Sequence, residues 1–512
     1  MIRIGDVRSQ PLKHPWREGI AMGRAFELMR ADAQAHLTLV QRTMKYRYCR
    51  FHGLFHEDMA VAARLEDGSL AYQWGQMDKL IDFLLSIGLR PFAELGPMPK
   101  ALSSGPTVFF HWQMNVTPPR NWSEWGDLVR AFAEHAIERY GIEEVRQWRF
   151  EVWNEPNLDA FWTGTQEDYW NLYRTAAEAL KGVDSQLQVG GPASAEAGWI
   201  DDFLDFVDKN DVPADFLSTH AYPQNEFASH PTRAESPHAP GMYFPATVRW
   251  VRERVRASSR PNLPIYWTEW SALDAKDKED IDWYANSTID ELYAAALVTH
   301  VCRNLDADSD GLFWWVASDI FEEMGLPQAP FSNTFGMVTI QGVPKASFHA
   351  FRLLAEMRGP VLSLEIESPH PGASAVATQE GKMVRVLLWN HVPRGLPEEV
   401  WEGEISVPDL AGRIASSLHV KRDRGSAYEA WRDAGESHNS TSVQEQVIAA
   451  LSTPEGRMTR MSDGDFAFRL EPGEVMLVEF GRAPDPKIEK GTDSDLTANW
   501  NDQLHVPDSA NT

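Results

Sequence analysis

The chain has 512 residues, enough for one large domain and a smaller one, and its 43% hydrophobic and 24% charged residues are ordinary proportions for a globular protein. Its formal net charge of −26 excludes favourable binding to nucleic-acid phosphates and to anionic membrane surfaces, because both would repel it. The first residues lack an apolar signal core and no apolar run is long enough to span a bilayer, so we predict a cytoplasmic protein.

Only two cysteines occur, Cys49 and Cys302, and both are flanked by apolar residues. We therefore expect buried free thiols and no disulfide framework. The large negative charge also resists self-association, which favours a monomer.

Predicted strands and helices alternate from residue 19 onwards. The segment 74–87, for example, places its apolar residues on one face of a helix with a period of 3.6. The predicted strand-then-helix pairs are, in chain order, 19–24 with 26–40, 46–51 with 74–87, 89–95 with 125–140, 150–157 with 166–181, 188–192 with 199–209, 215–222 with 245–257, 264–271 with 289–305, and 311–316 with 347–357. This alternation predicts an α/β fold, a (β/α)8 TIM barrel over residues 19–359.

The alternative, a doubly wound open sheet, would be expected to bring a glycine-rich phosphate turn after its first strand, and residues 19–24 lack that motif. After Pro360 the pattern changes to short alternating runs, such as 383–389 and 474–480, separated by turn residues. These predict a smaller C-terminal antiparallel β-sandwich over residues 360–481. We expect residues 1–18 to form an N-terminal segment that supplies an edge strand of the sandwich, and residues 482–512 to form a polar tail.

Two glutamates end predicted strands in aromatic surroundings. Glu155 follows the strand at 150–152, directly after Asn154, and Glu269 ends the strand at 264–271. The active site of an eight-stranded barrel lies at the carboxyl ends of its strands, and a carboxylate placed there is costly unless it is used. The two strands lie on opposite sides of the barrel mouth, so both carboxylates can face one sugar. A retaining glycosidase needs them about 5–5.5 Å apart and an inverting one about 6.5–9.5 Å apart.

The two glutamates need different protonation states, because a general acid must hold a proton and a nucleophile must stay ionised. We expect His220 and Tyr222 to orient Glu269, and Arg50 to supply a nearby cation. Asn154 is expected to bind the sugar 2-hydroxyl. Further polar or aromatic residues at strand ends are Arg24, His52, Glu94 and Trp315.

Short motifs in the chain resemble glycoside hydrolase family 39, the family of β-xylosidases and α-L-iduronidases. They are WNEPN at 153–157, TEW at 268–270 and RFHG at 50–53, with further matches at 89–96 and 318–323. The resemblance covers residues 19–350 and implies a retaining double-displacement mechanism, with Glu155 as acid/base and Glu269 as nucleophile. It also implies sugar contacts from His52, Asn154, His220, Tyr222, Trp315, Glu322 and Glu323.

Within that family the motif FEE at 321–323 is closer to the xylosidase branch, since two acidic side chains beside the sugar would repel a uronic acid. The long charged stretch at 274–280 departs from the family pattern, so the rim contacts around residues 274–284 are left open.

No metal and no cofactor is predicted. The segment 306–311 begins like a calcium loop, but Ala317 stands where a bidentate glutamate is needed. His52 and His56 are four residues apart, but Gly53 disfavours a helix there and the neighbouring residues do not complete a zinc signature.

Our hypothesis is an exo-acting β-xylosidase that releases xylose from the non-reducing end of short xylo-oligosaccharides. The exo assignment rests on the inserts 96–122 and 223–246, which are long enough to wall a cleft into a pocket. The alternatives are a β-glucosidase or α-L-arabinosidase on the same scaffold and, from a different class, a non-catalytic carbohydrate-binding protein.

Overall fold

A computed structural model describes residues 1–223, 243–272, 288–327, 329–392, 397–407, 414–438, 441–461 and 465–482. The chain divides into two compact units. One unit contains His14–Ser271 and Ala307–Pro327, and the other contains Met1–Lys13, Ala272–Asp306 and Gln328–Thr512. A search of the described helices finds none with the length and apolar character that crossing a membrane requires.

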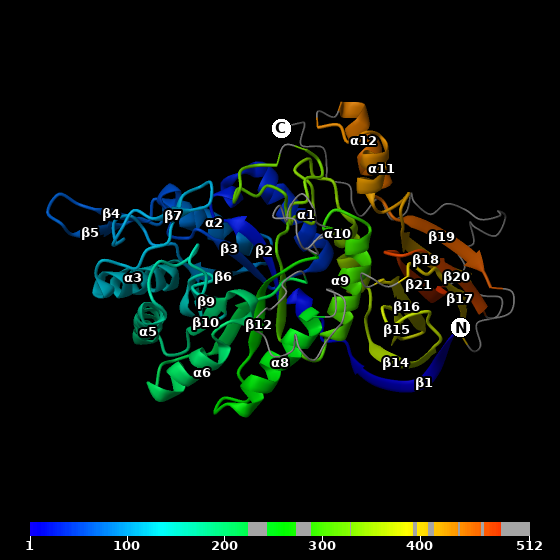
Figure 1. Cartoon of the computed structure of the whole chain (residues 1–512), viewed down its shortest axis with the longest axis horizontal. Helices are drawn as coiled ribbons and strands as arrows, with labels where there is room; N and C mark the ends of the chain where they lie inside the picture. Colours follow the sequence, from blue (N-terminus) through cyan, green and yellow to red (C-terminus); the bar gives the residue numbers. More distant parts are fainter. Residues whose placement is uncertain are drawn as a thin grey trace. The chain divides into compact units, whose positions relative to one another are not determined.

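The first unit contains a closed barrel of parallel strands (Figure 1). Around the barrel the strands follow the order β10-β11-β12-β13-β2-β3-β6-β9. Their bounds are β2 (Gly19–Arg24), β3 (Tyr48–His52), β6 (Arg90–Leu95), β9 (Arg149–Val152), β10 (Gln188–Ser194), β11 (Phe216–His220), β12 (Ile265–Trp270) and β13 (Gly311–Trp314). The predicted TIM barrel is confirmed.

Helices follow the strands along the chain, as the periodicity predicts. In the first unit they are α1 (Ala31–Met44), α2 (Gly75–Ser86), α3 (Trp122–Tyr140), α4 (Ile142–Val145), α5 (Gln166–Val183), α6 (Ile200–Lys209) and α8 (Tyr243–Ala257). Helix α5 begins with a capping box, in which Thr165 and Asp168 satisfy each other's backbone N–H groups. The second unit contains α9 (Tyr293–Asn304), α10 (Ala346–Ala355), α11 (Ala427–Asp433) and α12 (Ser442–Leu451).

Two layers of side chains come from the same five barrel strands. The lower layer is a buried aromatic cluster that consists of Tyr48, Phe92, Phe216, Tyr266 and Phe313. Two residues further towards the carboxyl ends lies the upper layer, which consists of Arg50, Glu94, Ser218 and Thr268 on the strands and Trp315 directly after β13, all buried. The strand period of two places both sets on the same face. The barrel interior therefore changes from aromatic to largely polar over two residues.

The second unit contains a nine-stranded sheet with the order β19-β18-β21-β16-β15-β14-β1-β17-β20. Its strands are β1 (Ile2–Pro11), β14 (Pro360–Ile366), β15 (Ala373–Glu380), β16 (Met383–Asn390), β17 (Trp401–Ser406), β18 (Ile414–Val420), β19 (Glu455–Arg460), β20 (Asp465–Leu470) and β21 (Val475–Arg482). Apolar side chains from β1, β14 to β18, β20 and β21 share one core, which includes Ile2, Val386 and Phe480. The predicted smaller β domain is present, as a mixed sheet.

Strand β1 differs from the predicted edge strand, because it lies between β14 and β17. It pairs antiparallel with β14 along most of its length and parallel with β17 only at Ile2 and Arg3. Most of β1 therefore has one hydrogen-bonded neighbour and an exposed, polar sequence, which is why the segment resembles an edge strand. The expected polar tail lies outside the described residues from residue 483 onwards.

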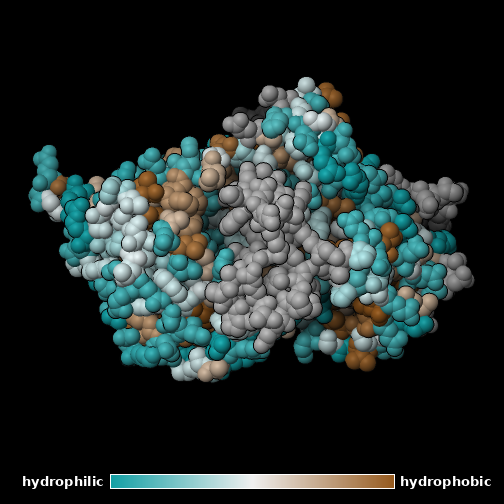
Figure 2. Space-filling view, viewed as in Figure 1, coloured by the Kyte–Doolittle hydropathy of each residue, from teal (hydrophilic) through white to brown (hydrophobic). Residues whose placement is uncertain are grey.

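The face of the molecule in Figure 2 is mostly hydrophilic where its residues are described. This fits a chain with 74 acidic and 48 basic residues. Both cysteines are free and buried, as predicted.

Candidate active site

A tight turn after β9 presents Asn154 and Glu155. Trp153 and Glu155 both adopt left-handed backbone conformations, with φ of 71° and 44°, which non-glycine residues rarely do. The turn is fixed from both sides, because the Glu155 N–H donates to Ala193 O at 2.8 Å and the Trp153 indole N–H donates to Phe161 O at 3.0 Å. Trp153 packs against Trp162. Its ring is therefore part of the packing around the turn.

Strand β12 places Glu269 at the site through a break in its alternation. Trp267 and Trp270 both pack on Phe244 of α8, with ring centroids 5.5 and 5.6 Å away. The two residues between them, Thr268 and Glu269, both face the barrel interior, where they make the hydrogen bonds given below. The register of β12 shifts against both neighbouring strands at this point. A bulge of this kind re-aims side chains, and here it brings a carboxylate inward.

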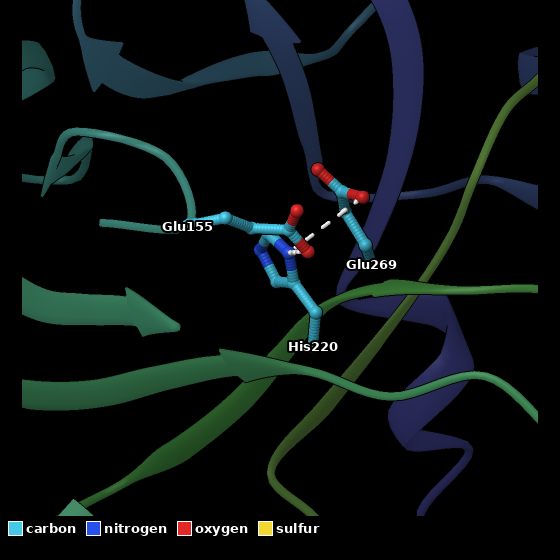
Figure 3. Close-up of side chains that lie close together, drawn as sticks. All are labelled: Glu155, His220 and Glu269. Carbon is cyan, nitrogen blue, oxygen red and sulfur yellow. Dashed lines mark hydrogen bonds and ion pairs between the residues drawn. The ribbon is translucent and has the colours of Figure 1, made fainter. Parts of the chain in front are cut away.

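Glu155 and Glu269 face each other across His220 of β11 (Figure 3). Each of the three offers an oxygen or nitrogen atom that lies within 4.8 Å of the other two. His220 Nδ1 is 2.9 Å from Glu155 Oε1 and 3.6 Å from Glu269 Oε2. The expectation that His220 orients Glu269 is therefore wrong: the hydrogen bond of His220 is to Glu155. Two carboxylates and an imidazole are also groups that can ligate a metal ion. Here His220 contacts both carboxylates directly.

Two donors hold the carboxylate of Glu269. Arg50 Nη1 donates to Oε1 at 2.7 Å, and the Tyr222 hydroxyl donates to Oε2 at 2.7 Å. Burial and the charge of Glu269 raise the pKa of Tyr222 well above its ordinary value, so its hydroxyl stays protonated. The predicted cation and one of the two predicted orienting groups are thus in contact with Glu269, and both stabilise negative charge on it.

Arg50, a member of the upper layer, connects Glu269 to three further polar side chains. Its guanidinium, fully buried, also donates to Glu151 Oε2 at 2.6 Å and to Asn154 Oδ1 at 2.8 Å, and lies 3.0 Å from Glu94 Oε2. Burial alone would lower the pKa of Arg50, but Glu151, Glu94 and Glu269 raise it above its ordinary value. The hydrogen bond to Asn154 fixes the amide so that its nitrogen faces away from Arg50.

Sequence reasoning missed Glu151. It stands between Phe150 and Val152 in β9, and its second oxygen accepts a hydrogen bond from the Thr268 hydroxyl at 2.8 Å. An acidic residue between two apolar residues of a barrel strand is the signal that would have identified it, because a buried charge needs a partner. Its partner is Arg50.

Glu155 has the environment of a proton donor. Burial, followed by the nearby charge of Glu269, raises the pKa of Glu155 well above its ordinary value, although Arg50 opposes the shift. Burial and the charge of Arg50 hold the pKa of His220 well below its usual range, so its imidazole is neutral. The site can therefore hold a proton on Glu155 while Arg50 and Tyr222 stabilise negative charge on Glu269.

His52, Trp315 and Glu323 form another wall of the site. The His52 Nε2 atom lies 3.6 Å from Glu269 Oε1 and 3.8 Å from Glu323 Oε1, and its ring centroid is 4.7 Å from that of Trp315. Its Nδ1 atom is 2.6 Å from Glu94 Oε2, and burial lowers the pKa of His52 to about 3. Burial and the charge of Glu269 raise the pKa of Glu323 well above its ordinary value.

Glu322 is placed differently from its neighbour. Its carboxylate accepts a hydrogen bond from Arg24 Nε at 2.9 Å. The structure therefore brings most of the predicted site residues into one connected group: Glu155, Glu269, His52, Asn154, His220, Tyr222, Trp315 and Glu323. Glu322 instead forms an ion pair with Arg24.

The segment 306–311, which begins like a calcium loop, leads into β13. Its carboxylates have protein partners: Asp310 Oδ2 accepts the Ile265 N–H at 2.9 Å, and Arg249 Nε lies 3.3 Å from Asp308 Oδ2. His56 lies 2.9 Å from Asp58, whereas His52 contacts Glu94. Most of the insert 223–246, and the rim at 274–284, lie outside the described residues.

Comparisons with known proteins agree on a family. Residues 2–463 match the family Glycosyl hydrolases family 39. A β-xylosidase from Caldicellulosiruptor saccharolyticus is 39% identical over 73% of this chain and 75% of its own length. One from Geobacillus stearothermophilus is 33% identical over 95% of this chain and 96% of its own. The crystal structure of a monomeric β-xylosidase from Caulobacter crescentus CB15 is similar at a TM-score of 0.81 and 30% identity, covering 94% of this chain and 99% of the other.

Proposed function

Because this chain belongs to glycosyl hydrolase family 39, and is therefore a glycosidase, we propose that it is a retaining, exo-acting β-xylosidase. Its reaction would release xylose from the non-reducing end of short xylo-oligosaccharides by double displacement. The two relatives that are 39% and 33% identical over most of the chain are β-xylosidases, which supports this choice of sugar.

One observation carries the mechanism: a carboxylate oxygen of Glu155 and one of Glu269 lie within 4.8 Å of each other. An inverting glycosidase keeps its carboxyl groups about 6.5–9.5 Å apart to admit a water molecule, whereas a retaining one needs about 5–5.5 Å. The separation favours direct attack by one carboxylate. We assign attack to Glu269, whose charge Arg50 and Tyr222 stabilise, and proton transfer to Glu155.

In the first step Glu155 gives its proton to the leaving oxygen while Glu269 attacks the anomeric carbon, which forms a covalent glycosyl-enzyme. Glu155, now ionised, then removes a proton from water, which attacks the same carbon and releases the sugar with its original anomeric configuration. The raised pKa of Glu155 suits the first step, because the acid is still protonated when the leaving group arrives.

The proposed sugar contacts are His52, Asn154, His220, Tyr222, Trp315, Glu322 and Glu323. Since Arg24 pairs with Glu322, repulsion of a uronic acid would come chiefly from Glu323 when it is ionised. The insert 96–122 supports a closed pocket, because it brings the ring centroid of Phe110 to 6.3 Å from that of His52, next to an apolar cluster around Trp112. We also propose a monomer, which light scattering coupled to gel filtration would test.

A panel of aryl glycosides that differ in ring substituent and anomer tests the sugar assignment. We expect the aryl β-xyloside to give the highest kcat/KM. A higher value for an aryl β-glucoside or α-L-arabinoside would replace this assignment with one of those activities, and no turnover of any member would favour a carbohydrate-binding protein. Proton NMR of the first-formed anomer tests retention: β-xylose appears first from a retaining enzyme, and α-xylose would refute the mechanism.

A further inference from the structure

The segment that follows β13 carries Phe321, Glu322 and Glu323, and it is held at Glu322 in two ways. The Glu322 N–H donates to Glu27 Oε1 at 2.7 Å. The Glu322 carboxylate accepts a hydrogen bond from Arg24 Nε at 2.9 Å. One residue is therefore fixed through its backbone by a buried carboxylate and through its side chain by a buried guanidinium.

Glu27 lies in a short 3-10 helix, Glu27–Met29, directly after the end of β2, and only 1% of its surface is exposed. Its second oxygen accepts the N–H of Arg24 at 3.1 Å. Burial raises the pKa of Glu27 to about 8, opposed by these two backbone hydrogen bonds. A buried carboxyl group is costly unless its oxygens have hydrogen-bond partners, and the N–H groups of Arg24 and Glu322 are such partners for Glu27.

Gly23 makes room for this arrangement. A Cβ atom at residue 23 would lie 2.5 Å from Glu27 Oε2 and 2.8 Å from the ring of Phe321. Both distances are too short for non-bonded atoms. Any other residue at this position would push the carboxylate and the ring apart.

Arg24 is also held by several contacts. Besides Glu322 it pairs with Asp58, and its guanidinium lies 5.3 Å from the ring centroids of Phe26 and Trp112. Asp58 in turn lies 2.9 Å from His56 Nδ1. Groups from several loops at the carboxyl ends of the strands thus converge on the guanidinium that holds Glu322.

The next residue along the chain is Glu323, which faces the site. Its carboxylate lies 3.8 Å from His52 Nε2, and its backbone carbonyl accepts the His111 N–H at 2.8 Å. A displacement of Glu322 would therefore move a carboxyl group that lies next to both His52 and the sugar position proposed above.

We propose that Gly23, Arg24 and Glu27 form a clasp that positions Glu322 and Glu323 for sugar binding, with Glu27 as its principal positioning residue. The clasp rests on the proposed function, since it supplies the geometry of that sugar site. Glu27 acts through Glu322 and touches no reacting atom.

Glu27→Gln tests the clasp with little change in shape. A glutamine keeps one acceptor oxygen but presents an NH2 group to one of the two N–H donors, so one hydrogen bond is lost. We expect KM for the aryl β-xyloside and the inhibition constant of free xylose both to rise at least about tenfold, with kcat changed less than about threefold. Losing sugar binding equally from the ground state and the transition state raises KM and leaves kcat unchanged.

Glu429→Gln is the matched control. Glu429 is also buried, accepts the Leu292 N–H at 2.8 Å and lies in the other unit. We expect it to lower the melting temperature while KM and the xylose inhibition constant keep their wild-type values. If folded Glu27→Gln keeps both constants within about twofold of wild type, or if Glu429→Gln raises them equally, the clasp is refuted.

If Glu27→Gln does not fold, Arg24→Lys replaces it, because lysine keeps the charge but cannot bridge Asp58 and Glu322 with a planar fork. KM for the aryl β-xyloside and the inhibition constant of free xylose then decide the outcome. If the wild-type enzyme prefers another aryl glycoside, the proposed function has failed, and the comparison of KM on that glycoside, with its own free sugar as inhibitor, still decides the clasp.

Discussion

The lower and upper layers of the barrel lie two residues apart on the same five strands, and they differ in what they contribute. In the lower layer Phe92 meets the rings of Tyr48, Phe216, Tyr266 and Phe313 at centroid distances of 4.8 to 5.9 Å. Such aromatic pairs add about 0.5–1.5 kcal/mol each beyond the burial of their surface. The lower layer therefore stabilises the fold.

The upper layer buries charge. Arg50, fully buried, is surrounded by Glu94, Glu151 and Glu269. Burial and then the charge of Glu269 raise the pKa of the nearby Glu155. Removing charges from water costs more than their attraction returns unless every group is well paired. The chain therefore separates stability from chemistry by a shift of two residues along each strand, and mutations in the two layers should have separable effects.

Glu269→Ala should give the largest effect. Without the nucleophile we expect kcat on an aryl β-xyloside to fall by about 10⁴-fold or more, as when other enzymes lose the residue that forms the covalent intermediate. The melting temperature should change little, because the substitution also removes one of the charges that crowd Glu155 and Glu323. Steady-state kinetics and calorimetry on one preparation measure both. A folded variant with equal activity to wild type would remove Glu269 from the mechanism.

Glu155→Ala should have an effect that depends on the leaving group. Xylobiose needs a proton on its leaving oxygen, so kcat/KM should fall by about 10²–10⁴-fold. The aryl group of an activated aryl xyloside leaves without a proton, so the first step with this substrate should be much less affected. Pre-steady-state bursts with the aryl substrate separate the two steps. Equal losses on both substrates would show that Glu155 is not the acid.

Phe92→Ala should have the opposite effect to the substitutions of the two glutamates, with a large loss of stability and little loss of activity. Removing the central ring of the lower layer should cost about 3–5 kcal/mol of unfolding free energy through lost burial and a residual cavity. The remaining folded enzyme should keep kcat within about threefold of wild type, since no reacting group moves. Denaturant unfolding and activity measured well below the melting temperature test this. Phe92→Leu is the control, with a smaller loss of stability. A large fall in kcat in the folded state would show that the layers are coupled.

The barrel and the approach of its two glutamates could be predicted from the sequence. Alternating strand and helix patterns predicted the barrel, and the strand-end position of Glu155 and Glu269 predicted their approach. Both predictions depend on local periodicity and on the rule that parallel strands end on one side of a barrel. The family motifs pointed to His52 and Tyr222, which contact Glu269, and to Trp315, whose ring packs against that of His52.

The rest depends on contacts between distant segments. His220 could be assigned to the site but not to Glu155, because the choice between two carboxylates a few ångströms apart depends on the bulge in β12. Glu151 and Glu27 have no motif of their own, and their partners, Arg50 and Glu322, are 101 and 295 residues away in the chain. Strand β1 looked like an edge because its partners lie hundreds of residues later.

Glu196→Gln should give the smallest effect and the finest test of the upper layer. Glu196 is exposed, yet its charge contributes to raising the pKa of Glu155, after burial and Glu269. Its removal should lower that pKa, so the alkaline limb of kcat/KM, where Glu155 loses its proton, should shift to lower pH. The shift should shrink as salt is added, because added ions screen an exposed charge. Glu167→Gln, an exposed glutamate on α5 outside the causes of that shift, is the control and should leave the limb in place. If both variants leave the limb unchanged at low salt, the pKa of Glu155 is set inside the upper layer alone, by burial and by the charges around Arg50.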